Sequence, residues 1–471
     1  MRVASLTVVM AGLFLPLGVL LGGAAPASAF GCPLASDFTV SNKNSLPPFT
    51  ICVVNSNVTL TIANTGSLYY DGSTLLNDGT VNIGGVLVDL TSSTDISEDK
   101  LTNFGTVFNS NVLAALGTVT NAGTFINSLG TASIGTLNNA GGLTNTGTLN
   151  LQDAINTVGA TLDNAGTLTL GGAAVNIPVF PPAGFILGLG TFTNNGTITN
   201  DAGSQLNNVE TLVNNGNLTN GVGGTLTNKG SLIVSAGATL INSGSMTNAG
   251  NEFCNISCLT IQARGTLSNT AGSSYVQTSG RTIVDGTLNS VPAIQIQAGS
   301  LVGTGTINGN VAMTGRIVNG IERPTIQPGE QGTPGTLTIN GNFNTSVTSS
   351  FDELIGGNGL GNGRVIVNGT ATLGADSLLN IVLLNGFTPL AGETFTLMDF
   401  LGGSGTFANA PTTGFQMDGI NWTISYNAND IILDAGSPVP EPSSVIVMGP
   451  SLAALFGYLW RKRAATLHDL S

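Results

Sequence analysis

Short runs of alternating apolar and polar residues recur along the chain from about residue 64 to residue 310. Each run follows an Asn-x-Gly triplet, begins with Thr or Ser and ends near another Asn, as in residues 103–109, 121–127 and 195–200. Alternation with a period of two is typical of a strand with one buried face. Asn and Gly are the residues that best tolerate the positive φ of tight turns. The pattern predicts strands of about three to five residues separated by turns.

The glycines of these turns lie at positions 105, 123, 147, 166, 196, 216, 230 and 244, so the repeat clusters near 20 residues. Antiparallel hairpins need longer arms on both sides of each turn. A parallel solenoid needs short strands and turns at this period. We therefore predict an all-β fold whose body, residues 64–310, is a right-handed parallel β-helix (β-solenoid) with its coils about 4.8 Å apart.

In a solenoid, one apolar residue of each strand points inward and stacks on its counterpart in the next coil. The expected core residues are Val107, Phe125, Leu137, Leu149, Leu168, Ile198, Leu218, Leu232 and Leu240. Asparagines at the corners are expected to form side-chain amide ladders of the kind found in stacked sheets. Two stretches interrupt the repeat, residues 177–189 with three prolines and residues 251–258, and both are predicted to be surface loops.

The N-terminal residues have the features of an export signal. Arg2 precedes an apolar stretch over residues 3–21, and Ala27-Ser28-Ala29 has the small residues of a cleavage site. We predict a signal peptide over residues 1–29, cleaved by recognition of Ala27 and Ala29, and an N-terminal cap with a disulfide over residues 30–63.

The four cysteines fit an oxidising compartment. The simplest pairing is local, Cys32 with Cys52 and Cys254 with Cys258. A metal site is the alternative, but zinc sites favour histidine or further cysteines. The single histidine, His468, lies beyond the apolar C-terminal run. We therefore expect disulfides and no metal or other cofactor.

Residues 437–471 combine three features. Val439-Pro440-Glu441-Pro442 is a stiff, extended segment, because proline fixes φ and disfavours the helix before it. Residues 445–460 carry no charge and are at or just under the ~17–25 residues that a helix needs to span a bilayer. Arg461-Lys462-Arg463 follows on the side that the positive-inside rule assigns to the cytoplasm. The tail predicts one transmembrane helix, 445–460, with a basic end.

This tail resembles the PEP-CTERM sorting signal of Gram-negative bacteria in its Pro440-Glu441-Pro442, its short span and its basic triplet. The resemblance implies an exosortase-type membrane enzyme as processing partner. It also implies an inner-membrane anchor before processing, and then the cell surface or an exopolysaccharide-containing matrix as destination. Eight residues follow the triplet, where the family usually stops sooner. A plain C-terminal anchor is the alternative.

A second resemblance covers residues 299–434. The phrases at 301–311, 334–343 and 365–373 resemble the C-terminal portion of autotransporter-type β-helical passengers. This resemblance implies that the last coils pass into longer, partly antiparallel strands that seal the end. We therefore assign residues 311–436 to a β-rich C-terminal cap.

Composition and charge narrow the function. Charged residues make up 8% of the chain, against about 25% in ordinary domains, and the net charge is −13. An acidic balance disfavours nucleic acid as a partner. Glycosidases need two carboxylates about 5–9.5 Å apart. The acidic residues of the repeat region do not recur as pairs at the coil spacing, and Asp352 and Glu353 are strand neighbours that point to opposite faces.

We therefore predict no catalytic, cofactor-binding or metal-binding residues. The expected function is that of a non-catalytic exported surface or matrix protein, structural or adhesive, whose polar, amide-rich faces contact exopolysaccharide or like copies. A passive spacer stays open. The other alternative is a β-helical polysaccharide lyase or glycoside hydrolase, which a groove with facing carboxylates and an arginine would favour.

Overall fold

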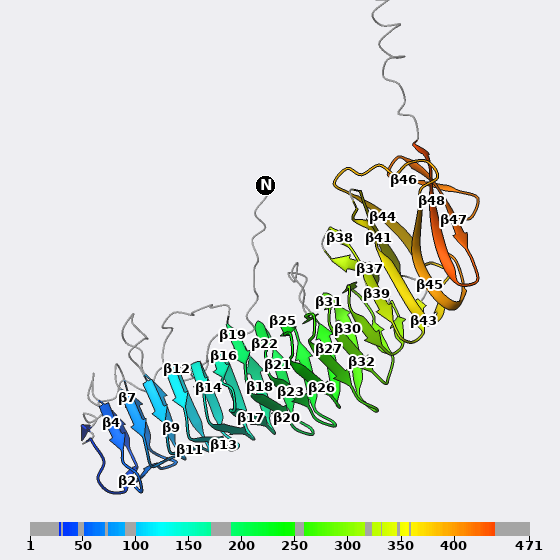
Figure 1. Ribbon diagram of the computed structural model, residues 1–471. Coiled ribbons are helices and arrows are strands. Elements are labelled where there is room, and N and C mark those ends of the chain that lie inside the picture. The colour runs from blue at the N-terminus through cyan, green and yellow to red at the C-terminus, as the bar shows by residue number, and fades with distance from the viewer. Residues whose placement is uncertain are drawn as a thin grey trace, which may run out of the picture. The chain divides into compact units, whose positions relative to one another are not determined.

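The computed structural model describes residues 28–29, 32–45, 51–70, 74–89, 100–170, 190–249, 259–315, 323–330, 332–345, 349–357 and 359–438 (Figure 1). All elements assigned within these ranges are strands, β1 to β48, so the all-β prediction is confirmed. The described residues fall into two compact units, one ending at Ala154 and the other beginning at Ile155.

In the first unit, each strand pairs in parallel with strands one coil away, and the strands form three columns. The first column consists of β2 (Phe38–Val40), β5 (Thr59–Ile62), β8 (Thr80–Ile83), β11 (Thr106–Asn109), β13 (Thr124–Asn127) and β15 (Gly142–Asn145). The second consists of β1 (Ser28–Ala29), β3 (Lys43–Ser45), β6 (Ser67–Tyr70), β9 (Val86–Asp89) and the first parts of β12 (Val112–Asn121) and β14 (Thr131–Asn139). The third consists of β4 (Ile51–Val54), β7 (Thr74–Asn77), β10 (Lys100–Asn103) and the last parts of β12 and β14. The boundary between the units falls within β16 (Thr148–Asn156).

The second unit repeats this arrangement with three strands per coil. Its first column consists of β17 (Thr161–Asn164), β20 (Thr197–Asn200), β23 (Asn217–Asn220), β26 (Thr239–Asn242), β29 (Thr266–Asn269), β32 (Thr287–Ser290), β35 (Thr306–Asn308), β39 (Thr336–Ile339) and β43 (Arg364–Thr372). Its second consists of β18 (Thr167–Leu170), β21 (Gln205–Asn208), β24 (Thr225–Asn228), β27 (Ser245–Ala249), β30 (Ser274–Ser279), β33 (Ile294–Ile296), β36 (Val311–Met313) and β40 (Phe343–Thr345). Its third consists of β19 (Thr191–Asn194), β22 (Thr211–Asn214), β25 (Ser231–Val234), β28 (Leu259–Ile261), β31 (Arg281–Val284), β34 (Ser300–Gly303), β37 (Thr325–Glu330), β41 (Ser350–Gly356) and β44 (Leu378–Leu384).

The C-terminal strands of the second unit are longer and partly antiparallel, as expected for the cap. β45 (Thr394–Ser404) pairs in parallel with β43, and then β48 (Asp430–Pro438), β47 (Ile420–Tyr426) and β46 (Phe415–Met417) pair antiparallel in that order. Two short strands turn back on their predecessors, β38 (Thr333–Pro334) on β37 and β42 (Gly361–Asn362) on β41. Phe395 and Trp422 pack edge to face inside this cap, with ring centroids 6.2 Å apart.

The predicted core is confirmed. All nine expected core residues are at most 1% exposed. They meet across coils in register, for example Val107 opposite Phe125, and Leu218 opposite Leu240. The residues between them on each strand point outward, and these are mostly threonine, which packs well on a pleated, half-buried surface.

Asparagines form a second part of the core. The prediction that they lie at the corners is therefore wrong for these residues. The last residue of most four-residue strands is an asparagine that points inward, and nearly all of these are 0% exposed. Each side-chain amide nitrogen donates to the amide oxygen of the asparagine one coil further along the chain. In the first unit the ladders are Asn77–Asn103–Asn121–Asn139 and Asn109–Asn127–Asn145. In the second they are Asn156–Asn194–Asn214, Asn164–Asn200–Asn220–Asn242–Asn269 and Asn208–Asn228–Asn248.

The ladders are tolerated in the core because, apart from one oxygen, their buried amide groups all have hydrogen-bond partners in the described part of the chain. Asn220 Nδ2, for example, donates to Asn242 Oδ1 at 2.7 Å and to Ser245 O at 3.1 Å, while Asn220 Oδ1 accepts from Asn200. A ladder that begins beside an aliphatic residue has no asparagine donor for its first oxygen, and Asn77 Oδ1, opposite Val54, accepts from Gly79 N instead. Asn208 lies opposite Leu170, and Asn208 Oδ1 is buried with no hydrogen-bond partner in the described part of the chain.

The glycines of the Asn-x-Gly turns are needed for close approach and not, as predicted, for positive φ. A Cβ at Gly105 would lie 2.0 Å from Gly79 O, and one at Gly123 would lie 2.1 Å from Gly105 O, while neither residue has positive φ. The turns of neighbouring coils stack so closely that only glycine fits. Positive φ occurs instead at other turns, such as those of Gly203 and Gly223.

The Cys32–Cys52 disulfide is present, with the Cα atoms 5.1 Å apart, and this pairing is confirmed. Ala29 lies in β1, where it pairs with Ser45. Several predicted features lie outside the described residues. They are Ala27, Cys254, Cys258, both predicted loops and the sorting-signal residues Val439, Pro440, Glu441, Pro442, Arg461, Lys462 and Arg463. Within the described ranges, no helix has the length and apolar character needed to cross a membrane.

The adjacent residues Asn214 and Asn215 test the buried ladder. Asn214 is 0% exposed, accepts from Asn194 and donates to Thr239 O, whereas Asn215 is exposed and donates to Asn195. We expect Asn214→Ala to lower the free energy of unfolding by roughly 2–4 kcal/mol, because it leaves buried polar groups unpaired. Asn215→Ala should change it by less than about 0.5 kcal/mol. Urea unfolding of both variants would measure the difference, and equal midpoints would contradict a structural role for the buried amides.

Candidate functional site

An exposed row of amides lies on the outer face of the first column of the second unit. Asn289 Nδ2 donates to Ser268 Oγ at 3.0 Å, Asn308 to Asn289 at 2.7 Å, Asn340 to Asn308 at 2.6 Å and Asn368 to Asn340 at 2.7 Å. We call Asn289, Asn308, Asn340 and Asn368 the exposed amide ladder. Its donors point toward the preceding coil, which is opposite to the direction in the buried ladders.

Local sequence explains this row. The exposed asparagines alternate with buried residues such as Ile307 and Ile339, so the pleat turns their side chains outward. Asn308, Asn340 and Asn368 are each followed by glycine. A Cβ at Gly341 would lie 2.4 Å from Gly309 O, so these glycines let successive turns stack and hold the amides in line.

The exposed amide ladder is an uncharged hydrogen-bonding surface. Each internal amide uses one N–H and one lone pair within the ladder, and a primary amide has a second of each. A threonine lies two residues before three of these asparagines and therefore points to the same outer face as the ladder. These threonines are Thr287, Thr306 and Thr338. The surface offers donors and acceptors that recur at the coil spacing of about 4.8 Å. Such a surface can bind hydroxyl-rich or amide-rich ligands.

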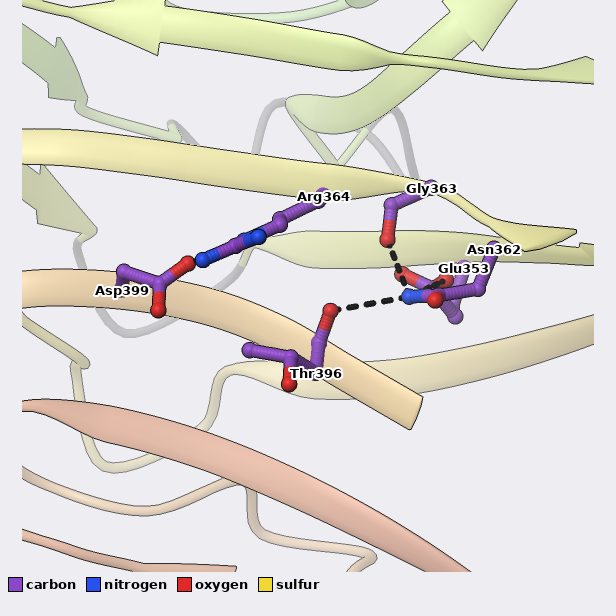
Figure 2. Close-up of polar contacts among 6 residues, drawn as sticks. All are labelled: Glu353, Asn362, Gly363, Arg364, Thr396 and Asp399. Atoms are coloured by element: carbon purple, nitrogen blue, oxygen red, sulfur yellow. Dashed lines mark hydrogen bonds and ion pairs between the residues drawn. The ribbon is translucent and has the colours of Figure 1, made fainter. Parts of the chain in front are cut away.

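The most perturbed carboxyl of the described chain belongs to Glu353 on β41, and Figure 2 shows its surroundings. Its side chain is 0% exposed. Asn362 Nδ2 donates to Glu353 Oε1 at 3.1 Å, to Gly363 O at 2.5 Å and to Thr396 O at 2.8 Å. Glu353 Oε2 is buried with no hydrogen-bond partner among the described residues. We call Glu353, Asn362, Gly363 and Thr396 the Glu353 cluster.

Burial raises the pKa of Glu353 well above its usual range, and the hydrogen bonds from Asn362 and Gly363 oppose this only in part. Burial therefore favours the neutral form of this carboxyl. Arg364, the next residue after Gly363, points away from it toward Asp399, with which it forms an ion pair (Figure 2). Asp352 is only partly buried and accepts a hydrogen bond from Ser350, so the expected opposite orientation of Asp352 and Glu353 is confirmed. Complete burial keeps Glu353 from contacting a substrate.

A second group of ionisable residues was missed in the sequence analysis. Asp285, Glu330 and Arg281 are separated by up to 49 positions, yet they come together because β31, β34 and β37 stack in one column. Asp285 Oδ1 accepts from Thr304 N and Thr304 Oγ1, both at 3.1 Å. Arg281 Nε is buried without a hydrogen-bond partner in the described chain. The coil register could have revealed this group, but the irregular register between β34 and β37 hides it in the sequence.

The hydrogen bond with Asp285, together with burial and the charge of Asp285, raises the pKa of Glu330 to about 7, against the opposing charge of Arg281. Burial lowers the pKa of Arg281. Glu330 therefore keeps its proton up to near neutral pH. Carboxyls that interact this strongly lie close together, whereas the two carboxyls of a glycosidase are about 5 Å or more apart, so this pair does not favour hydrolase chemistry.

Of the predicted site residues that the structure describes, Cys32 and Cys52 form their disulfide and Ala29 lies in β1. The described part of the chain holds no group of three or more His, Cys, Asp or Glu side chains suited to a metal ion. Comparison of the chain with protein-family models and with curated proteins finds no match.

Glu330→Gln tests the raised pKa of Glu330. Because the pKa of Glu330 is raised from 4.5 to about 7, the folded chain keeps a proton that the unfolded chain has released in this window. Stability therefore falls as pH rises from about 4.5 to about 7. We expect the unfolding midpoint of Glu330→Gln, relative to wild type, to rise across this window and to level off above it. Glu210→Gln is the matched control, and a difference between Glu330→Gln and wild type that stays constant with pH would contradict the raised pKa of Glu330.

Proposed function

We propose that the protein is a non-catalytic, exported structural or adhesive protein of the cell surface or extracellular matrix. Its body would be a right-handed solenoid that presents hydrogen-bonding faces. The observation that carries this proposal is the exposed amide ladder, which repeats coil after coil and carries no charge. A regular neutral surface suits the binding of an extended ligand better than catalysis at a single site.

The exposed face, and not the buried ladders, would make the contacts. The expected amide-rich faces are only partly available, because the strand-end asparagines of the main repeat are nearly all 0% exposed. This leaves the exposed amide ladder and the threonine rows beside it. Exopolysaccharide or a like copy fits this surface, because both offer neutral hydrogen-bonding groups. Nucleic acid does not fit a chain of net charge −13.

The export route belongs to the same proposal. The Pro-Glu-Pro segment, apolar run and basic triplet of residues 439–463 support sorting by an exosortase-type enzyme. The chain would be held in the inner membrane by residues 445–460 and then passed to the surface. The signal peptide would be removed after Ala29, and the Cys254–Cys258 disulfide would form after export.

A β-helical polysaccharide lyase or glycoside hydrolase is the second candidate, and one observation favours it. Asp285, Glu330 and Arg281 place two carboxyls and an arginine together. The strong interaction between the two carboxyls speaks against the hydrolase, since glycosidases hold their carboxyls about 5–9.5 Å apart with the sugar or water between them. A reducing-end assay on neutral and acidic polysaccharides would decide. Product formation that Glu330→Gln abolishes would establish the enzyme.

Substitution within the exposed amide ladder tests adhesion. Asn308→Ala with Asn340→Ala removes the central rungs, and we expect retention on immobilised neutral polysaccharide to fall on the order of tenfold, since each lost hydrogen bond is worth about 1 kcal/mol. Asn215→Ala, in an exposed amide pair elsewhere in the second unit, should bind like wild type. Equal retention by all three proteins would remove the exposed amide ladder as the binding surface.

Fractionation of cells tests the sorting signal. We expect Glu441→Ala to accumulate as an unprocessed form in the inner-membrane fraction, because the enzyme recognises the Pro-Glu-Pro segment. Wild type should appear at the surface as a shorter chain, and Glu393→Gln should behave as wild type does. Unchanged processing and surface location in Glu441→Ala would show that residues 440–442 are not a sorting signal.

A further inference from the structure

The Glu353 cluster joins three strands that are distant in sequence. Glu353 lies on β41, Asn362 on β42 and Thr396 on β45. The Nδ2 atom of Asn362 donates hydrogen bonds to both Glu353 and Thr396 and so links the three strands (Figure 2). β42 has only two residues, paired with Ile355 and Gly356 of β41. The side chain of Asn362 is therefore a principal polar link between β42 and the cap strand β45.

The protonation state of Glu353 decides whether the link between β42 and β45 is stable. A neutral carboxyl fits the site, because it accepts from Asn362 and needs no counter-ion. An ionised carboxyl would bury a charge whose Oε2 has no partner among the described residues. Such a charge is expensive to keep out of water. The chain would lower this cost by opening at the weakest neighbouring element, which is β42.

The charged groups around the site do not supply a counter-ion. Arg364 on β43 is the nearest cation in Figure 2, and it is paired with Asp399 of β45. The remaining ionisable groups on the strands packed here are Asp352 on the outer face of β41 and Glu330 at the end of β37, and both are acids. β42 and β44 carry no ionisable residue. Ionised Glu353 would therefore meet no free positive charge on these strands.

We propose that Glu353 is a proton-controlled lock for the C-terminal end of the solenoid, which holds β42 on β41 and β45 while protonated and releases β42 when the proton leaves. The coils before β37 take no part in this opening, because they contain no member of the Glu353 cluster. The lock is a conformational device and does not depend on the adhesive function proposed above.

The direction of the pH effect follows from linkage. The pKa of Glu353 is raised in the closed form, while in the open form the carboxyl meets water and regains its ordinary value near 4.5. Opening therefore releases a proton and becomes easier as pH rises above about 4.5. The opening equilibrium changes by up to about tenfold per pH unit until Glu353 ionises in the closed form as well.

Hydrogen exchange on the full chain tests the lock. Protection factors, corrected for the intrinsic pH dependence of exchange, would be measured between pH 5.5 and 8.5 for peptides covering residues 354–363 and, as reference, residues 225–242. Glu353→Gln is the key variant, because glutamine has the same shape and stays neutral. In wild type, protection of 354–363 should fall up to about tenfold per pH unit relative to Glu353→Gln, with the reference peptides unchanged.

Two controls keep the result specific. Glu393→Gln makes the same change at the same end of the unit, where the carboxylate accepts from Leu390 N at the surface, and it should retain the wild-type pH dependence. Wild type alone supplies a readout if Glu353→Gln folds poorly, since only the 354–363 peptides should respond to pH. A wild-type response equal to that of Glu353→Gln, or equal loss of protection in the reference coil, would overturn the proposal.

Discussion

The need to satisfy every buried amide governs the architecture of both units. An asparagine at the end of a strand enters the core only if another asparagine lies in the same position one coil away, because an unpaired buried amide costs about 1–3 kcal/mol. This condition is met at coil spacings of 18 residues in the first unit and 20 in the second, and also across longer coils, such as the 36 residues between Asn164 and Asn200. A slip of one residue would turn the amides outward and the threonines inward. Apolar packing alone would tolerate more variation in register than these ladders do.

Much of this arrangement could be predicted from the sequence. The period-two alternation and the glycine spacing predicted short parallel strands, and the nine expected core residues are buried. The inward direction of the asparagines was missed, because hydrophobicity treats Asn103 or Asn121 as a surface residue. Their position two residues after a core leucine or valine contained the information. The role of the turn glycines was also misread, since close approach between coils depends on the neighbouring backbone and not on local conformation.

The positions of the ionisable groups could be predicted from the sequence only in part. Asp352 and Glu353 were correctly placed on opposite faces by alternation alone. That burial favours the neutral form of Glu353 follows only from the closed packing around Asn362. The pairing of Asp285 with Glu330 needs the register of three successive coils, one of which contains an irregularity. The exposed amide ladder could be predicted from the sequence only in part. Three of its four asparagines precede glycines, as many others in the chain do, and only the pleat separates them from the buried ones.

The uniform direction of the buried amides has a consequence for the electrostatics of each unit. Every amide donor in these ladders points toward the following coil, so the amide dipoles add head to tail, as peptide dipoles do along an α-helix. Each ladder should carry a partial negative charge at its first oxygen and a partial positive charge at its last nitrogen. The exposed amide ladder is aligned the other way and offsets part of this polarity. A stack of nominally uncharged side chains thus gives the sheet an electrical axis that composition alone would not reveal.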